Sequence, residues 1–314
     1  MRNRNIFHLL AVLLFMFLLM TGSFQSAQAA EFDKNGQLSK GEVVNDDLFI
    51  GADIVVVDGE VNGNLLASAD SITINGIVNG NALLLGRTIV VSETAVINGN
   101  LFAGASTIEI AGQVTGSVFG GSAALMLKET AIVGSNVYYG GYSLEMDQGS
   151  QVGIDLFAGV YQAMLKGSIT RDAKLGAGAV ELNGSIGRDA NINLGEVSSK
   201  NSGPTNFMKN MPFMQQPGIP PAIQPGLRVA EGSVIHGKLT YTSSQDMTSG
   251  IQAQPEGGVV YIIPTPTGRD KFKTARHGFP GWLWNTLRKM ITLLILGLLS
   301  VRLLPTLLKP VAEQ

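Results

Sequence analysis

The chain has 314 residues and a formal net charge of −2, with 45% hydrophobic and 15% charged residues. This composition excludes general disorder and favours one large domain with additional segments. The chain has no cysteine, which excludes disulfides and thiolate metal sites. Residues 31–200 hold 19 acidic and 9 basic residues, a net of −10. Nucleic-acid binding needs clustered positive charge, so we expect no nucleic-acid partner.

The N-terminus has the three parts of a secretory signal peptide. Arg2 and Arg4 precede an apolar run at residues 9–20, and small residues follow as far as Ala30. The pattern predicts a signal peptide over Met1 to Ala30 and an extracytoplasmic location for the residues after it. The alternative is an uncleaved membrane anchor, although the apolar run is short for a membrane span.

A four-residue motif recurs through the first two thirds of the chain. V-N-G-N at residues 61–64 returns letter for letter at 78–81, as I-N-G-N at 97–100 and as V-T-G-S at 114–117. The β-branched residue that opens the motif recurs every 17 or 19 residues, at Val44, Val61, Val78, Ile97, Val114, Val133, Val152, Ile169 and Ile186. Such a period is typical of a solenoid.

Within each repeat, short runs of alternating apolar and polar residues are separated by glycines. This alternation predicts three short strands per coil rather than helices. We therefore predict an all-β fold, a parallel β-helix of about 17–19 residues per coil, over residues 43–195. Nine or ten coils would stack at about 4.8 Å, so that each backbone pairs with its neighbours.

The third residue after the β-branched residue, which is the residue after the glycine in V-N-G-N, forms a polar column. Its members are Asp47, Asn64, Asn81, Asn100, Ser117, Asn136, Asp155, Asp172 and Asp189. Asn and Asp accept left-handed corners and can also hydrogen-bond along a stack, which favours a structural role. Alternatively, the three last aspartates form a metal site or an acid–base set. Arg171 and Arg188 alternate with these acids, so we favour an exposed Arg–Asp ladder.

The repeat stops after residue 195. Residues 196–228 are rich in Ser, Asn, Pro, Met and Gln, which predicts a loop or linker insertion. Residues 229–243 restore the motif and are predicted to form a final coil or cap. We interpret residues 244–282 as a juxtamembrane linker with a strand candidate at 259–263.

Residues 283–308 are predicted to form a transmembrane helix. The apolar run Ile291–Val301 lies at its centre, and Trp282 and Trp284 would lie at the membrane interface. The alternative is a buried or interfacial helix. Basic residues between Arg269 and Lys289 would lie outside the cytoplasm if the repeats are exported, against the positive-inside rule. The sequence therefore leaves open which side of the membrane the β-helix faces. It also leaves open whether a longer native protein has further spans.

Candidate chemical groups are few. The chain has three histidines, of which His8 lies in the predicted signal peptide and His277 in the basic segment. His236 stands alone beside Gly237, which favours a solvated corner over a ligand. No Ser-His-Asp arrangement, metal-spaced cluster or G-x-x-x-x-G-K phosphate loop is found. We therefore predict no enzyme, no catalytic or metal site and no cofactor.

Several aromatic residues cluster in the later repeats, namely Tyr138, Tyr139, Tyr142, Phe157 and Tyr161. Half-buried pairs between neighbouring coils are the favoured interpretation. The alternative is an exposed ladder that binds sugars.

The V-x-G-[NS]-[LVA] units at Val61, Val78, Ile97 and Val114, with Gly-Ser-Ile before an acidic turn at Gly167 and Gly184, resemble the bactofilin, or polymer-forming cytoskeletal, family. Two other solenoid families fit less well. Hexapeptide acyltransferases need a strict six-residue aliphatic recurrence and catalytic or metal histidines, and this sequence has neither. Pectin-degrading β-helices need a cleft with clustered Asp and Arg or Lys, and no such cluster is present in the sequence. The resemblance covers residues 43–195 and 229–243. It implies a right-handed β-helix that joins end to end into filaments without nucleotide.

The sequence as a whole predicts a non-enzymatic scaffold, tethered to a bacterial membrane, that associates with itself through its coil ends. The signal peptide, the C-terminal segment and the insertion depart from a typical soluble bactofilin and weigh against a cytoskeletal role. The alternative function is a cell-surface module that binds a cell-envelope polysaccharide or protein.

Overall fold

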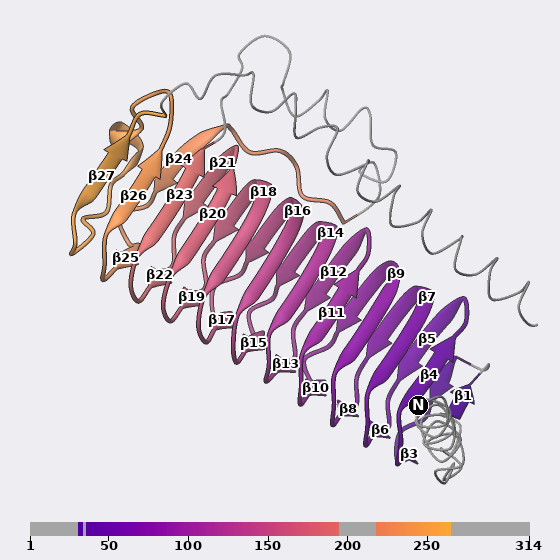
Figure 1. Ribbon diagram of the computed structural model, residues 1–314. Helices are drawn as coiled ribbons and strands as arrows, with labels where there is room; N and C mark the ends of the chain where they lie inside the picture. Colours follow the sequence, from indigo (N-terminus) through magenta and orange to yellow (C-terminus); the bar gives the residue numbers. More distant parts are fainter. Residues whose placement is uncertain (1–30, 34–35, 195–217, 265–314) are drawn as a thin grey trace, which may run out of the picture. The chain divides into compact units, whose positions relative to one another are not determined.

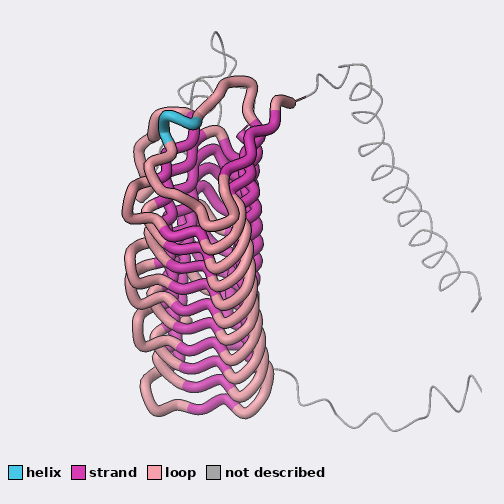
Figure 2. The backbone as a smooth tube through the Cα atoms, turned by 90° about the vertical axis from the view of Figure 1, so that its left-hand side faces the viewer, coloured by secondary structure: helices cyan, strands magenta, loops and turns pink. Residues whose placement is uncertain are grey.

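The chain forms a parallel β-solenoid in the computed structural model, which describes residues 31–33, 36–194 and 218–264 (Figure 1). The solenoid has about 11 turns, and Figure 2 shows its coils stacked one above another. In this part of the chain, the one helical element is a 3-10 turn, η2 (Thr248–Gly250). The predicted all-β parallel solenoid is therefore confirmed.

Two sheets run the length of the solenoid, and every strand pairing in them is parallel. The larger sheet contains β1 (Glu31–Asp33), β2 (Gln37–Leu38), β4 (Leu48–Gly51), β5 (Ile54–Val57), β7 (Leu65–Ile74), β9 (Ala82–Val91), β11 (Leu101–Gly104), β12 (Thr107–Ile110), β14 (Val118–Leu127), β16 (Val137–Met146), β18 (Leu156–Leu165), β20 (Ala173–Ala177), β21 (Ala179–Leu182), β23 (Ala190–Leu194), β24 (Gly226–Val229), β26 (Leu239–Thr242) and β27 (Val259–Ile262).

The smaller sheet consists of two-residue strands, one per coil. They are β3 (Val43–Val44), β6 (Glu60–Val61), β8 (Ile77–Val78), β10 (Val96–Ile97), β13 (Gln113–Val114), β15 (Ile132–Val133), β17 (Gln151–Val152), β19 (Ser168–Ile169), β22 (Ser185–Ile186) and β25 (Val234–Ile235). The β-branched residue that opens each motif is thus the second residue of each short strand.

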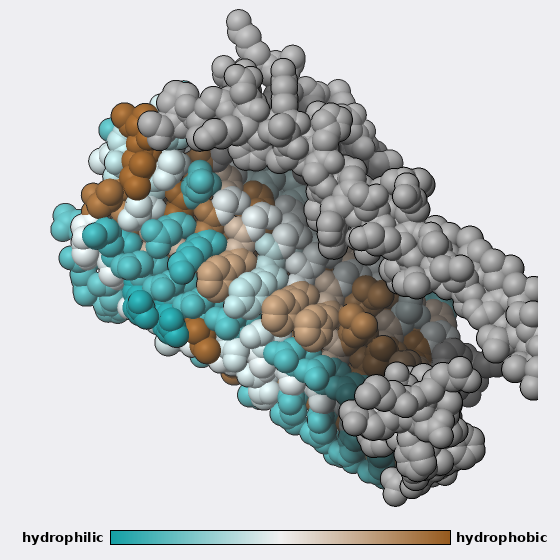
Figure 3. All heavy atoms as spheres, viewed as in Figure 1, coloured by the Kyte–Doolittle hydropathy of each residue, from teal (hydrophilic) through white to brown (hydrophobic). Residues whose placement is uncertain are grey.

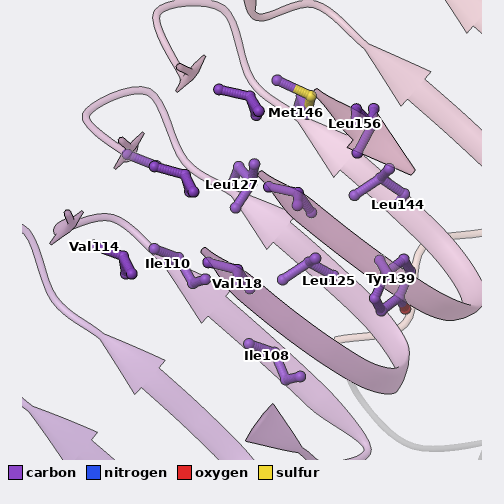
Figure 4. Packing of buried hydrophobic residues seen from close by; sticks show 14 of the residues in the cluster. Ile108, Ile110, Val114, Val118, Leu125, Leu127, Tyr139, Leu144, Met146 and Leu156 are labelled. Atoms are coloured by element: carbon purple, nitrogen blue, oxygen red, sulfur yellow. The ribbon is translucent and has the colours of Figure 1, made fainter. Parts of the chain in front are cut away.

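The core consists of columns of apolar side chains that repeat from coil to coil. One column comprises Val44, Val61, Val78, Ile97, Val114, Val133, Val152, Ile169, Ile186 and Ile235, all of them buried. Figure 4 shows side chains from successive coils, among them Ile108, Leu125 and Leu144, meeting in the same interior. Each fully buried aliphatic side chain contributes roughly 1.5–3 kcal/mol. No single coil could form this core, because each inward residue packs against its equivalents above and below.

Coils of 17 and 19 residues share one register because the two extra residues lie in a single corner. In longer coils this corner closes with an additional backbone hydrogen bond, as from the Ala95 N–H to the Ser92 carbonyl at 2.9 Å and from Ala131 to Lys128 at 2.9 Å. The strands on either side keep their alignment, so that Ile74 pairs with Val91 and Val91 with Ile110. The variable spacing in the sequence therefore leaves the core columns unbroken.

The motif glycines are explained by close backbone approach. A Cβ atom on Gly80 would lie 2.4 Å from the carbonyl oxygen of Gly63 in the preceding coil, and one on Gly99 would lie 2.4 Å from that of Gly80. Among the described residues, no residue other than glycine has a positive φ. The expectation that Asn and Asp occupy left-handed corners is therefore wrong, and these residues have the different role described below.

The solenoid extends at both ends beyond the predicted coils. β1 and β2 pair with the coil of β4 and β5 at the N-terminal end. After the predicted final coil at 229–243, the Gln252 and Glu256 N–H groups donate to the Val229 and Ile235 carbonyls, and β27 pairs with β26. A further coil therefore follows the predicted final coil. The solenoid thus has more turns than the nine or ten predicted.

Among the described residues, no helix has the length and apolar character needed to cross a membrane. The predicted signal peptide (1–30) and transmembrane helix (283–308) lie outside the described residues, as do residues 196–217 of the predicted insertion. The right-handed winding implied by the resemblance stays a prediction.

Two glycines provide a matched test of the close-approach argument. We expect Gly80→Ala to lower the free energy of unfolding by about 1–3 kcal/mol, because its methyl group would force neighbouring coils apart. Gly140→Ala is the control, since a Cβ there would meet nothing within 4 Å. Chemical denaturation of the full-length chain, followed by circular dichroism, measures both. Equal losses in the two variants would contradict the explanation.

Candidate assembly and docking surfaces

The polar column after the motif glycine forms a continuous hydrogen-bonded ladder along the solenoid. Each side-chain oxygen accepts the backbone N–H of the equivalent residue in the next coil, from Asp47 through Asp189 to Lys238, at donor–acceptor distances of 2.7–3.3 Å. We call these residues the corner ladder. The predicted hydrogen bonding along the stack is confirmed. Asn and Asp occur here because their oxygen reaches a corner N–H in the coil above.

A second row of asparagines runs beside the corner ladder in the first coils. The Asn62 amide donates to the Asn45 side chain at 2.8 Å, Asn79 to Asn62 at 2.7 Å and Asn98 to Asn79 at 2.7 Å. Both asparagines of V-N-G-N therefore bond along the axis. The motif is a corner that specifies register, not a site for a ligand.

The aspartates considered for chemistry belong to the corner ladder. Asp155 and Asp172 are each 8% exposed, and Arg171 and Arg188 lie 3.5 and 3.4 Å from their carboxylates. The Arg–Asp ladder therefore exists, but its carboxylates are buried and only its arginines reach far into solvent. Asp155 Oδ1 accepts the Asp172 N–H at 3.0 Å, which commits the carboxylate to the backbone. The described residues contain no group of three or more His, Asp or Glu residues that could hold a metal ion.

His236 does not stand alone as the sequence suggested. Its Nδ1 lies 2.7 Å from Glu256 Oε1, a residue of the following coil. Both side chains are largely exposed, so the pair contributes little to stability. His236 is thus a solvated corner residue with an acidic neighbour.

The aromatic residues singled out in the sequence occupy three different environments. Tyr138 stacks on Phe157 with ring centroids 5.0 Å apart, and Tyr142 on Tyr161 at 5.3 Å, which confirms the favoured pairs between coils. Tyr139 points into the core, where its hydroxyl donates to the Ser122 and Ser143 carbonyls. Burial raises the pKa of Tyr139 to about 12. Tyr139 and Tyr142 are buried and therefore cannot belong to an exposed ladder.

Sequence reasoning missed the full length of the exposed stack. Its members lie two residues after the corner ladder and pair in register from coil to coil: Phe49, Leu66, Leu83, Phe102, Phe119, Tyr138 and Phe157. We call this set the aromatic stripe. Counting two positions forward from each Asn or Asp of the ladder would have found it.

An eight-residue segment, residues 218–225, lies along one corner of the solenoid, and we call it the strap (Figure 1). The buried side chain of Gln162 holds it at two points. Its amide nitrogen donates to the Pro221 carbonyl at 3.0 Å, and its amide oxygen accepts the Ile223 N–H at 2.9 Å. Ile219 packs against Tyr142 and Ala123. These contacts, together with the hydrogen bond from the Gln162 amide to Ser143 Oγ at 3.1 Å, explain why a glutamine is buried here.

The last coil leaves an apolar edge. Within the described residues β27 pairs with β26 alone, and its sequence Val-Val-Tyr-Ile carries no charge. Val259 continues the inward column of Leu239, yet it is 40% exposed where Leu239 is fully buried. At the opposite end, β2 and β3 each pair on one side only within the same residues. Within the described residues, both ends of the solenoid thus present strand edges, and at the C-terminal end a core column ends in the exposed Val259.

Residues 53–154 match the family model Bactofilin, described as polymer-forming cytoskeletal. These residues are similar to a bactofilin domain. The match extends from just before β5 to just after β17 and contains the units at Val61, Val78, Ile97 and Val114, so the predicted resemblance is confirmed over these residues. The units at Gly167 and Gly184 lie beyond the match. The family is structural rather than enzymatic. Searches of curated proteins and of solved structures gave no match.

Asp155 tests whether the buried aspartates serve the fold. We expect Asp155→Ala to destabilise the solenoid by about 1–3 kcal/mol, because the Asp172 N–H loses its acceptor. Asp155→Asn should cost less than about 1 kcal/mol, since an asparagine oxygen can accept the same N–H and only the Arg171 pairing is lost. Denaturant unfolding of the full-length chain measures both changes. A loss of similar size in the Asn variant would show that the charge matters instead.

Proposed function

We propose that the chain is a non-enzymatic scaffold that polymerises by joining its solenoids end to end. The bactofilin domain and the β-solenoid fold support a polymer-forming structural role. The observation that carries the end-to-end mode is β27, an uncharged edge strand whose core residue Val259 is left exposed.

Joining the C-terminal end to the N-terminal end of another copy would continue both the strand ladder and the core. Every pairing within the solenoid is parallel, so an N-terminal coil stacked on β27 would repeat the geometry already present between coils. Unpaired strand edges are templates for pairing with another chain. A head-to-tail contact of this kind does not close on itself, and repeated copies form an open filament.

The proposal includes a membrane tether. Its support is the apolar run Ile291–Val301 with Trp282 and Trp284 before it, together with the signal-like residues 1–30. In this arrangement the solenoid lies outside the cytoplasm and the C-terminal segment anchors it. Digestion of intact cells with added protease tests the orientation, because an outward-facing solenoid is cleaved or shaved from the membrane before lysis.

The alternative function, a polysaccharide-binding module, has weaker support. Sugars stack on the faces of aromatic rings, whereas the rings of the aromatic stripe cover one another's faces at centroid distances of 4.9–5.0 Å. Only ring edges are left for an incoming ligand. The alternative function also includes a protein partner. The exposed ring edges favour a protein over a polysaccharide.

A charge placed at the solenoid end tests the end-to-end mode. We expect Val259→Lys to abolish filaments of the full-length chain while leaving its fold intact, because the ammonium would be buried unpaired in the junction. Ile132→Lys is the matched control, since Ile132 is 41% exposed on the side of a central coil, against 40% for Val259. Electron microscopy and sedimentation measure assembly, and circular dichroism measures the fold.

Either of two outcomes would contradict the proposal. One is a native chain that stays monomeric at high concentration. The other is a Val259→Lys chain that forms filaments as readily as the Ile132→Lys chain.

A further inference from the structure

The N-terminal half of the aromatic stripe carries additional apolar surface beside it. Leu85 lies two residues after Leu83 on β9, and the two side chains are 50% and 39% exposed. Phe102 pairs with Leu83 in the next coil and is 38% exposed. In Figure 3 hydrophobic surface gathers over the N-terminal coils of this face. Contiguous apolar surface of this kind marks an interaction site more often than chance exposure does.

Leu85 makes this surface two columns wide at β9. In the next coil the equivalent position is Gly104, and in the coil before it is Ser68. A Cβ atom on Gly104 would lie 3.1 Å from Leu85 Cδ2, so the leucine leans over the glycine of the next coil. We use the name apolar patch for this leucine and the stripe members around it, Leu66, Leu83, Phe102 and Phe119.

The segment that joins β23 to β24 makes a long detour toward the N-terminal coils. Gly178 alone separates β20 from β21, whereas residues 195–225 separate β23 from β24. The last eight of these residues are the strap, and its first residue lies beside β12, because a Cβ atom on Gly218 would lie 3.6 Å from Thr107 Cγ2 (Figure 1). Thr107 lies five coils nearer the N-terminus than Leu194, the last residue of β23. The strap is therefore the return half of the detour.

The chain before the strap is longer than this detour needs. Five coils at about 4.8 Å span about 24 Å, a distance that about seven extended residues can cover. Residues 195–217 are 23 in number. More than half of them are therefore not needed to cover the distance.

The apolar residues of this segment lie close to the strap. Between positions 207 and 214 there are five bulky apolar side chains, whereas residues 195–206 contain only Val197 apart from proline, and residues 215–217 contain none. The five are Phe207, Met208, Met211, Phe213 and Met214. Methionine is unbranched and adapts to irregular apolar surfaces. The composition thus suits an apolar contact near the start of the strap.

We propose that residues 207–214 pack on the apolar patch of the same chain. Met214 precedes Gly218 by four residues, which reach at most about 14 Å. Leu85 lies three residues before Thr88, which pairs with Thr107 in the next coil. Strand and coil spacings make the distance from Leu85 to Thr107 about 11 Å. The patch is therefore within reach of the segment while the strap keeps its place.

Charge favours the same placement. Lys209 is the only charged residue between positions 201 and 217. The corner beside Leu85 holds Asp53, Asp70 and Arg87, which together leave a net negative charge. Complementary charges of this kind help to fix the register of a contact. One contact then accounts for both the detour of the chain and the exposed Leu85.

Labelling of a thiol in the patch tests the contact. The native chain has no cysteine, so Leu85→Cys supplies a single thiol in cells that produce the full-length chain. The Val259→Lys background keeps the outcome independent of end-to-end assembly. In the solenoid Leu85 is more exposed than Ile132 of the smaller sheet, 50% against 41%. We nevertheless expect a membrane-permeant maleimide to label Leu85→Cys about tenfold more slowly than Ile132→Cys, because a contact worth about 1.4 kcal/mol leaves the thiol open about a tenth of the time.

A matched pair of variants identifies the occupant. Replacing the five apolar residues of the segment by serine should restore fast labelling of Leu85→Cys. Replacing five polar residues of the same segment by serine should leave labelling slow, and these are Asn201, Thr205, Asn206, Asn210 and Gln215. Circular dichroism of the purified chains checks that the solenoid is intact in both variants.

A cross-link distinguishes a contact within one chain from a contact between chains. A bismaleimide should join Leu85→Cys to Phe213→Cys in a chain that still migrates as a monomer, and mass spectrometry should identify the cross-linked peptides. Ile132→Cys combined with Phe213→Cys is the control and should give no such peptides.

Several results would overturn the proposal. Equal labelling of Leu85→Cys and Ile132→Cys would show that the patch is uncovered. Slow labelling that survives the replacement of the five apolar residues would assign the patch to a lipid surface or another protein. A cross-linked dimer in place of the monomer would assign it to a second copy.

Discussion

The fold depends on one interaction, the hydrogen bond from a corner N–H in one coil to a side-chain oxygen in the coil below. Sheet pairing holds the strands of neighbouring coils together, but the corner after the motif glycine needs its own acceptor. Asn, Asp and Ser supply it from Asp47 to Asp189. The glycine that precedes Asn64, Asn81, Asn100 and Ser117 lets two coils approach closely enough there for the bond to form. Valine, glycine and asparagine in the repeat are therefore parts of one coil-to-coil contact.

A structure built from one repeated contact has no internal reason to stop. Stability in such a solenoid is approximately a sum over neighbouring coils, so the end coils lack half of their contacts. Val259 shows the consequence, because it lies in a core column and is exposed where no described residue stacks on it. The same physics that holds the coils together thus favours the addition of another copy. The aromatic stripe differs from these core columns, because its residues point outward and the coil itself does not require them.

Much of the fold could be predicted because each coil must satisfy the same geometry. The spacing of Val61, Val78 and Ile97 and the alternation between them were sufficient for strands, coil length and inward columns. The corner ladder was also predictable, since its residue type recurs at one position. The backbone conformation of the corner could not be predicted. Asn and Asp suit both left-handed turns and hydrogen bonds along the axis, and only the structure distinguishes the two.

The surfaces were harder to predict than the core. Tyr139 and Tyr138 are adjacent in sequence, yet alternation places one in the core and the other outside, so a cluster of tyrosines in the sequence divides into separate environments. The aromatic stripe mixes Phe, Tyr and Leu, so residue type alone does not mark it, and only its fixed offset of two residues from the corner ladder reveals it. Gln162 could be understood only in part from the repeat, because Ser143 of the preceding coil accepts one hydrogen bond from it but its other partners come from the strap about 60 residues later.

Hydrogen exchange at the corner amides tests the coil-to-coil contact most directly. In the full-length chain, the backbone N–H groups of Asn81, Asn100, Asp172 and Asp189 should exchange slowly, with protection comparable to that of the strand amides beside them. Each of these N–H groups donates to a side-chain oxygen of the coil below, which is the hydrogen bond that would protect it. Exchange at the rate of an unstructured peptide at these positions would contradict the account.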